Sequence, residues 1–136
     1  MNTMNDSPDV ALLHRAWEAM TQGDLAVLGG ALAPDAQWLG VEDGQLCGNR
    51  KAILEVIRRN LPGRLQGGIE ETIQDGSRVI VAFRPKQPAQ VDRPLDEGVA
   101  YMVVTILDGQ IVEMKGCADR AAAMTYAQTG TTSATD

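Results

Sequence analysis

Histidine and cysteine are scarce in this sequence. Its 136 residues include one histidine and two cysteines, Cys47 and Cys117, which lie far apart and form no CxxC motif. Because metal sites draw several such ligands at short spacings, we expect no metal. The N-terminus also lacks a basic start followed by a long apolar run. These features together predict a reduced, cytoplasmic protein.

Clusters of basic charge and long apolar runs are also missing. Lys and Arg number 12 against 18 Asp and Glu, which gives a formal net charge of -6. Because no local basic patch offsets this charge, we expect no nucleic-acid partner. No apolar stretch approaches the length of about 20 residues that a membrane-spanning helix requires. We therefore expect a soluble protein with no membrane partner.

The residues that are present suit a single globular domain. Hydrophobic residues make up 44% and charged residues 22%, close to the globular average. A chain of this length can bury one sizeable core. We assign the domain to residues 9–127, with a flexible N-terminus at residues 1–8. The Thr/Ser/Gly-rich residues 128–136 are predicted to be a disordered tail.

Helical signals fill the first half of the chain. A Ser-Pro-Asp sequence ending at residue 9 is typical of a helix start, and apolar residues then recur at helical spacing from Val10 to Met20. Asp24 is predicted to cap a shorter helix, and Asn49 a third one that ends at the Pro-Gly pair of residues 62–63. A short strand is expected between the last two, at residues 36–41.

Strand signals fill most of the second half. Strands are predicted at residues 68–74, 77–84, 98–107 and 110–118, with Asp-Gly turns at residues 75–76 and 108–109. The proline-rich residues 85–94 are expected to form a loop and a candidate lid. Asp119 should cap a short Ala-rich helix from Arg120 to about Ala127. Helices followed by antiparallel strands indicate an α+β fold.

The turn at residues 108–109 predicts which face of the last hairpin lies inside. An uninterrupted pairing sets Tyr101 opposite Gly116 and Val103 opposite Met114, and we predict that these residues line the interior. The opposite face is too apolar to be left in water, so we expect a homodimer to cover it. On the longer strand, that face carries Ala100, Met102, Val104 and Ile106. The first hairpin leaves open which of Glu70 and Glu71 points inward.

Four short segments together resemble the SnoaL-like superfamily, also called nuclear transport factor two-like. They are Gln22-Gly23-Asp24-Leu25, Leu32-Ala33-Pro34-Asp35-Ala36, Gly48-Asn49-Arg50-Lys51-Ala52-Ile53 and Asp108-Gly109-Gln110-Ile111-Val112-Glu113. The resemblance covers about residues 9–127. It implies a cone-shaped, strongly bent antiparallel sheet around an apolar cavity that three N-terminal-half helices close, and commonly a homodimer packed sheet to sheet.

The resemblance does not choose a function, because this fold hosts enzymes and binding proteins. Positions that transfer protons in members similar to ketosteroid isomerase fall near Ala16, Gly40 and Val103, which cannot do so. Those of the epoxide hydrolases fall near Phe83, Pro85 and Gly116, which cannot activate water either. The polyketide cyclases place an acid near the end of the last strand, where Asp119 is the nearest match.

Two hypotheses follow for the cavity. The first is a protein that binds an apolar or aromatic metabolite, oriented by the Tyr101 hydroxyl. The second is a cofactor-free cyclase, isomerase or hydratase that uses Asp119 or Tyr101 as general acid or base, although helix capping already explains Asp119. Neither needs a cofactor. The predicted ligand-binding residues are Trp17, Trp38, Gly40, Phe83, Tyr101, Val103, Met114 and Gly116.

Overall fold

A computed structural model describes residues 7–40, 45–60, 68–84 and 99–130. The helices are α1 (Pro8–Thr21), α2 (Ala26–Ala31), α3 (Arg50–Asn60) and α4 (Arg120–Thr129). The strands are β1 (Leu32–Leu39), β2 (Gln45–Cys47), β3 (Ile69–Asp75), β4 (Arg78–Phe83), β5 (Ala100–Leu107) and β6 (Gln110–Cys117). The predicted lid loop lies outside the described residues, as do residues 1–6 and 131–136. In the described ranges, no helix is both long enough and apolar enough to cross a membrane.

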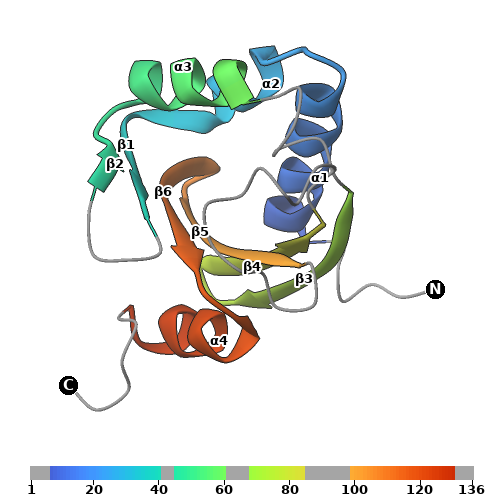
Figure 1. Cartoon of the computed structure of the whole chain (residues 1–136), viewed down its shortest axis with the longest axis vertical. Coiled ribbons are helices and arrows are strands. Elements are labelled where there is room, and N and C mark those ends of the chain that lie inside the picture. Colours follow the sequence, from blue (N-terminus) through green and yellow to red (C-terminus); the bar gives the residue numbers. More distant parts are fainter. Residues whose placement is uncertain (1–6, 41–44, 61–67, 85–98, 131–136) are drawn as a thin grey trace.

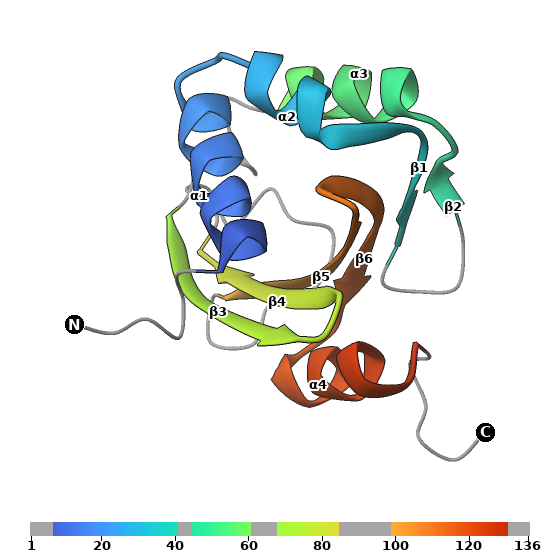
Figure 2. The same cartoon turned by 180° about the vertical axis from the view of Figure 1, so that it is seen from behind.

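The strands form one strongly bent sheet in the order β2-β1-β6-β5-β4-β3. Figures 1 and 2 show α1, α2 and α3 around its concave side and α4 against the opposite face. The predicted α+β cone, closed by three helices and followed by a short C-terminal helix, is confirmed. The sheet is antiparallel except where β1 lies parallel to β6. That junction can be parallel because a long stretch of chain separates the two strands.

Side-chain caps confirm the predicted starts of α1, α3 and α4, whereas α2 begins one residue later than predicted, because its N-cap is Leu25, which makes no side-chain cap hydrogen bond. The backbone N–H of Ala52 donates to Asn49 Oδ1 at 2.8 Å, and that of Ala122 donates to Asp119 Oδ1 at 2.8 Å. Each contact satisfies one of the N–H groups that a helix start leaves free. The last helix continues to Thr129, two residues beyond the predicted end of the domain.

The β5–β6 hairpin turns where the sequence predicts. Asp108 and Gly109 both have positive φ, at 53° and 76°, as a two-residue turn of this kind requires. Leu107 pairs with Gln110 on either side of it. The β3–β4 turn falls one residue later than predicted, at residues 76–77, because Asp75 still pairs with Arg78.

A β-bulge in β6 changes the pairing beyond this turn. Ile106 pairs with Ile111, but the next residue of β5, Thr105, pairs with Glu113. Val112 is therefore an extra residue on β6, and it shifts every later pair by one position.

The predicted pairs of the hairpin are therefore wrong. Val104, not Val103, lies opposite Met114, and Met102, not Tyr101, lies opposite Gly116. Since paired residues share a face of the sheet, Met102 and Val104 point into the cone and Tyr101 and Val103 point away from it.

Both faces of β5 pack against other elements. The face predicted to form a dimer interface packs instead against the helices of the concave side, through Ala100, Met102, Val104 and Ile106. The other face packs under α4, where Val103 and Cys117 contact Tyr126 and its neighbours. The apolar surface that motivated the homodimer is therefore core. The homodimer itself stays a prediction.

Neither Glu70 nor Glu71 faces the cavity. Glu70 accepts a 2.7 Å hydrogen bond from Arg84 Nε, and Glu71 accepts a 3.1 Å hydrogen bond from Arg120 Nη2 at the start of α4. All four side chains are partly in solvent. An irregular pairing of β3 with β4 between Ile69 and Glu71 leaves both carboxylates outside.

Candidate functional site

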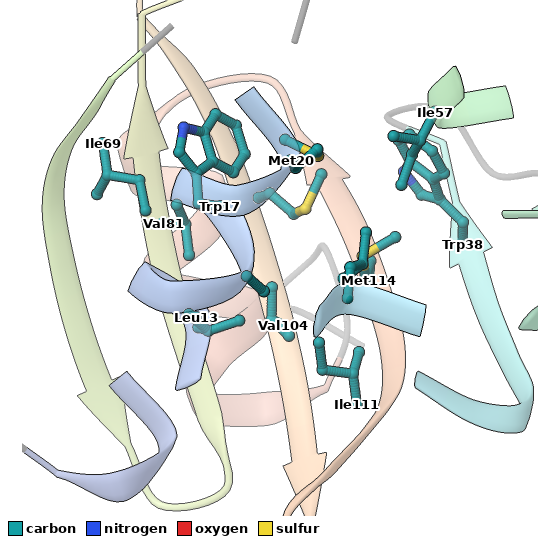
Figure 3. A pocket seen from close by; sticks show the side chains of 13 residues that line it. Leu13, Trp17, Met20, Trp38, Ile57, Ile69, Val81, Val104, Ile111 and Met114 are labelled. Carbon is teal, nitrogen blue, oxygen red and sulfur yellow. The ribbon is translucent and has the colours of Figure 1, made fainter. Parts of the chain in front are cut away.

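The concave side of the sheet encloses a pocket under the first three helices. Figure 3 shows Trp17, Ile69 and Val81 toward one side, Trp38 and Ile57 toward the other, and Met20, Val104 and Met114 between them. Thirteen side chains line it. They are Leu13, Ala16, Trp17, Met20, Leu28, Trp38, Ile57, Ile69, Val81, Met102, Val104, Ile111 and Met114.

One face of α1 supplies the helical wall of the pocket. Residues three or four positions apart share a face of a helix, so Leu13, Ala16, Trp17 and Met20 point together toward the sheet. The Trp17 ring lies against the Phe83 ring, with 4.7 Å between centroids and an interplanar angle of 53°. Phe83 thus supports Trp17 from β4 but is not among the lining residues.

Cross-strand pairs supply the sheet wall. Met114 on β6 lies between Val104 on β5 and Trp38 on β1, its partners in the two neighbouring strands. Ile111 and Met114 both face the pocket although an odd number of positions separates them. The bulge makes this possible, because its extra residue restores the inward direction of Met114.

The described wall of the pocket is apolar. None of its thirteen lining side chains is ionisable, and three are methionines and two are tryptophans. Its volume is about 50 Å³. Methionine side chains are flexible and polarizable, and so adapt to irregular shapes. The site is therefore suited to shape-based recognition of an apolar molecule rather than to proton transfer.

Three predicted ligand-binding residues, Trp17, Trp38 and Met114, do line the pocket. Gly116 lies half-buried opposite Met102, and the Gly40 carbonyl, directly after β1, accepts a hydrogen bond from Lys115 Nζ. Neither glycine is among the lining residues.

Tyr101 and Val103 lie on the opposite side of the sheet. Val103 is fully buried in the α4 cluster, and Tyr101 packs at its edge. The hydrogen bond and charge of Glu71 raise the pKa of Arg120, and Tyr101 adds a smaller effect in the same direction. The Tyr101 hydroxyl is therefore near the start of α4 and not in the pocket.

Asp119 also belongs to α4. Its carboxylate is exposed and caps the helix. The two residues considered as general acid or base thus stand outside the cone, on the face that α4 covers.

Most of the sheet wall was not predicted from the sequence. Met102 and Val104 were assigned to the outer face of β5, and the pattern of β4 did not decide the direction of Val81. One signal did identify the helical wall. The apolar stripe of α1 predicts a core face, and in this molecule the core face is also the pocket wall.

A polar cluster lies between the sheet and α4. The Tyr126 hydroxyl donates a 2.6 Å hydrogen bond to Glu113 Oε1. The Arg78 guanidinium lies 5.9 Å and the Lys115 ammonium 6.0 Å from the centroid of the Tyr126 ring. Burial, the hydrogen bond to Glu113 and the charge of Glu113 all raise the pKa of Tyr126. We interpret the cluster as an anchor for α4.

A metal centre finds no support in residues 7–40, 45–60, 68–84 and 99–130. Within these ranges, no three His, Cys, Asp or Glu side chains come together as a potential ligand set. Cys47 and Cys117 are both buried. Burial raises the pKa of the Cys47 thiol, which opposes formation of the thiolate that metals bind.

Comparison with known families agrees with this geometry. The family model of the SnoaL-like domain matches residues 13–114, which include every residue that lines the pocket. The chain belongs to the SnoaL-like domain family. No curated protein matches the sequence.

Solved structures show the same fold for this SnoaL-like domain. A nuclear transport factor two-like protein of unknown function from Burkholderia pseudomallei is 20% identical, with a TM-score of 0.62 over 90% of this chain and 98% of that one. A protein described as a polyketide cyclase, from Sinorhizobium meliloti, is 20% identical, with a TM-score of 0.63 over 85% and 99%. A steroid delta-isomerase from Pseudomonas aeruginosa is 18% identical, with a TM-score of 0.63 over 82% and 79%. At these identities the likeness concerns the fold alone.

Proposed function

We propose that this SnoaL-like domain binds an uncharged apolar or aromatic small molecule in the pocket of its cone. The observation that carries the proposal is the lining of thirteen side chains without one ionisable group. A charged ligand would lose its hydration there without gaining an ionic partner, which is costly. An apolar ligand gains from leaving water, roughly in proportion to the area it buries.

The size of the pocket distinguishes it from ordinary core. Its volume of about 50 Å³ exceeds the roughly 10–15 Å³ that a single water molecule needs, whereas protein interiors are otherwise closely packed. Water gains little in a cavity that offers it no polar partners. Trp17 and Trp38 add flat surfaces that suit an aromatic ring. The space is therefore best filled by an apolar group.

The names of two similar structures support the same ligand class. One is described as a polyketide cyclase and another as a steroid delta-isomerase. These names belong to those proteins, and the low identities carry no substrate to this chain. They do support a cone of this shape as a site for ring-containing molecules.

The enzyme hypothesis finds no group that transfers protons among the described residues that line the pocket. A cyclase, isomerase or hydratase without a cofactor needs a titratable side chain within reach of its substrate. Asp119 caps α4 and Tyr101 packs beside it, both on the face turned away from the pocket. The described part of the pocket wall therefore favours binding over catalysis.

Calorimetric titration with two related probes tests this function. Indole is uncharged, and indole-3-acetate carries the same ring with a carboxylate. We expect indole to bind and indole-3-acetate to bind about tenfold more weakly or worse, a difference of about 1.4 kcal/mol. Equal binding of the two probes, or tighter binding of indole-3-acetate, would contradict an apolar pocket.

A filled pocket supplies the matched control. Ala16 lines the pocket from α1, whereas Ala11 lies on the same helix outside the lining. Ala16→Leu should lower the affinity for indole, and Ala11→Leu should leave it unchanged. Thermal melts should accompany both variants, because overpacking costs about 1 to 3 kcal/mol of stability.

A further inference from the structure

The pocket as it stands is small for the ligand class proposed. Its volume is about 50 Å³, whereas a cavity that holds benzene measures about 150 Å³. An aromatic ligand can enter only if part of the wall moves. The backbone of the sheet resists such movement because its hydrogen bonds tie each strand to its neighbours, so on the sheet wall the movement must come from side chains.

Three lining side chains are flexible enough to move, namely Met20, Met102 and Met114. Met20 and Met114 are held in the core, with 3% and 5% of their surface exposed. Met102 is only partly buried. The Met102 side chain is therefore less restricted by its surroundings than the side chains of Met20 and Met114.

The neighbours of Met102 also differ on its two sides. Val81 lies opposite it on β4 and carries a side chain that lines the same pocket. Gly116 lies opposite it on β6, in a direct cross-strand pair, and has no side chain. Residues directly opposite each other in an antiparallel pair have side-chain positions about 4.5 to 5.5 Å apart. Gly116 thus presents no side chain beside Met102 on the inner face of the sheet.

We propose that Met102 is the adjustable wall of the pocket and that Gly116 is the recess into which it swings. In the free protein the Met102 side chain limits the cavity, and on binding it lies over Gly116 and makes room for an aromatic ring. The pair Met102 and Gly116 therefore sets the largest ligand that the domain accepts. This inference rests on the proposed binding function, and it adds that the ligand is an uncharged molecule with at least one aromatic ring.

Two probes of different size separate this inference from the binding function. Xenon is a single apolar atom of the kind that apolar cavities take up, whereas indole requires the enlarged pocket. Both are titrated into protein labelled with ¹³C at the methionine methyl groups and followed by NMR. The parent should bind both probes, and the Met102 methyl signal should move more with indole than with xenon.

Gly116→Val is the decisive variant. Gly116 is not a lining residue, so the added side chain fills the recess and not the pocket, and valine suits a strand. We expect xenon binding to stay unchanged and the affinity for indole to fall about tenfold or more. A loss of this size is typical when a hydrophobic pocket lacks room for one small group of its ligand. Met102→Leu keeps the side-chain volume but shortens the flexible chain, and it should also weaken the binding of indole. Met124→Leu, a half-buried position on α4, is the matched control and should bind indole as the parent does.

Each other outcome has a definite meaning. If Gly116→Val binds indole as the parent does, the recess is not used and the inference is wrong. If Gly116→Val loses both probes or does not fold, Met102→Leu becomes the test of the inference. The inference is then wrong if Met102→Leu binds indole as tightly as the parent does. A parent that binds xenon but not indole refutes the adjustable wall while leaving an apolar cavity. A parent that binds neither probe refutes both the wall and the proposed function.

Discussion

The hydroxyl of Tyr126 on α4 donates a 2.6 Å hydrogen bond to the carboxylate of Glu113 on β6. This contact joins the last helix to the convex face of the sheet. The guanidinium of Arg78 lies over the same ring and donates from Nη1 to the carbonyl of Ala127 at 3.4 Å. Tyr126 thus connects α4 to two strands, and its removal should loosen the helix without touching the pocket on the other side.

Replacing Tyr126 by phenylalanine should lower the free energy of unfolding by about 1 to 3 kcal/mol near neutral pH, because Glu113 loses a donor. Urea denaturation of the parent and the variant measures this. Indole binding serves as the control and should not change, since neither residue lines the pocket. Equal stability of the two proteins would mean that the contact does not anchor α4.

The same pair predicts a dependence on alkaline pH. The pKa of Tyr126 is raised in the folded protein above its ordinary value of 10.0, so the unfolded chain releases this proton first. The stabilising contribution is complete below pH 10.0 and is lost as the pH rises above that value. We expect the stability difference between parent and Tyr126→Phe to shrink as the pH rises past this point. A difference that stays constant to high pH would contradict the assigned cause.

Asp119 offers a test of capping against catalysis. Asp119→Ala should cost about 1 kcal/mol of stability, because the N–H of Ala122 loses its acceptor. Asp119→Asn should cost less, since asparagine is also a good cap. Both variants should bind indole as the parent does. A loss of probe binding in a variant that melts normally would place Asp119 in the ligand site and reopen the enzyme hypothesis.

The elements of the fold could be predicted because their signals are local. Asn49 and Asp119 cap helices through side chains that reach only three residues along the chain. Asp108 and Gly109 specify a tight turn by their own backbone preferences. Neither signal depends on what packs against the element. The parallel junction of β1 with β6 carries no such signal, and it was not predicted.

The inner face of β5 could not be predicted from the same sequence. Val103 packs under α4 and Val104 lines the pocket, so the strand is apolar on both sides and alternation gives no direction. The bulge at Val112 has no sequence signal either, because valine is as suitable in a regular strand as in a bulged one. A shift of one residue in the pairing then placed Tyr101 and Val103 on the wrong face of β5, whereas Met114 on β6 kept its predicted inward direction. Trp17 and Trp38 were correctly predicted to line the pocket because they lie on other elements, which the shift does not affect.

The two tryptophans give an optical test of the pocket. They are the only two in the chain, and both line the pocket from different elements, α1 and β1. An uncharged aromatic ligand in the pocket should therefore change the fluorescence of each of the single-tryptophan variants Trp17→Phe and Trp38→Phe. Benzene suits this measurement because it scarcely absorbs at the excitation wavelength of tryptophan. A response in one variant alone would place the ligand nearer one wall, and a response in neither would contradict the site.

The last prediction concerns Met102, which distinguishes the inner from the outer face of β5. Met102→Lys places a charge among apolar side chains, where the ammonium finds no ionic partner among the lining residues. We expect indole binding to be lost and stability to fall by about 1 to 3 kcal/mol, with the charge partly relieved by the exposure of this position. The oligomeric state, measured by light scattering, should match that of the parent, because Met102 faces the pocket and not a partner. A variant that dissociates a parent dimer while retaining indole binding would instead place Met102 on an interface, and would refute the pairing of Met102 with Gly116.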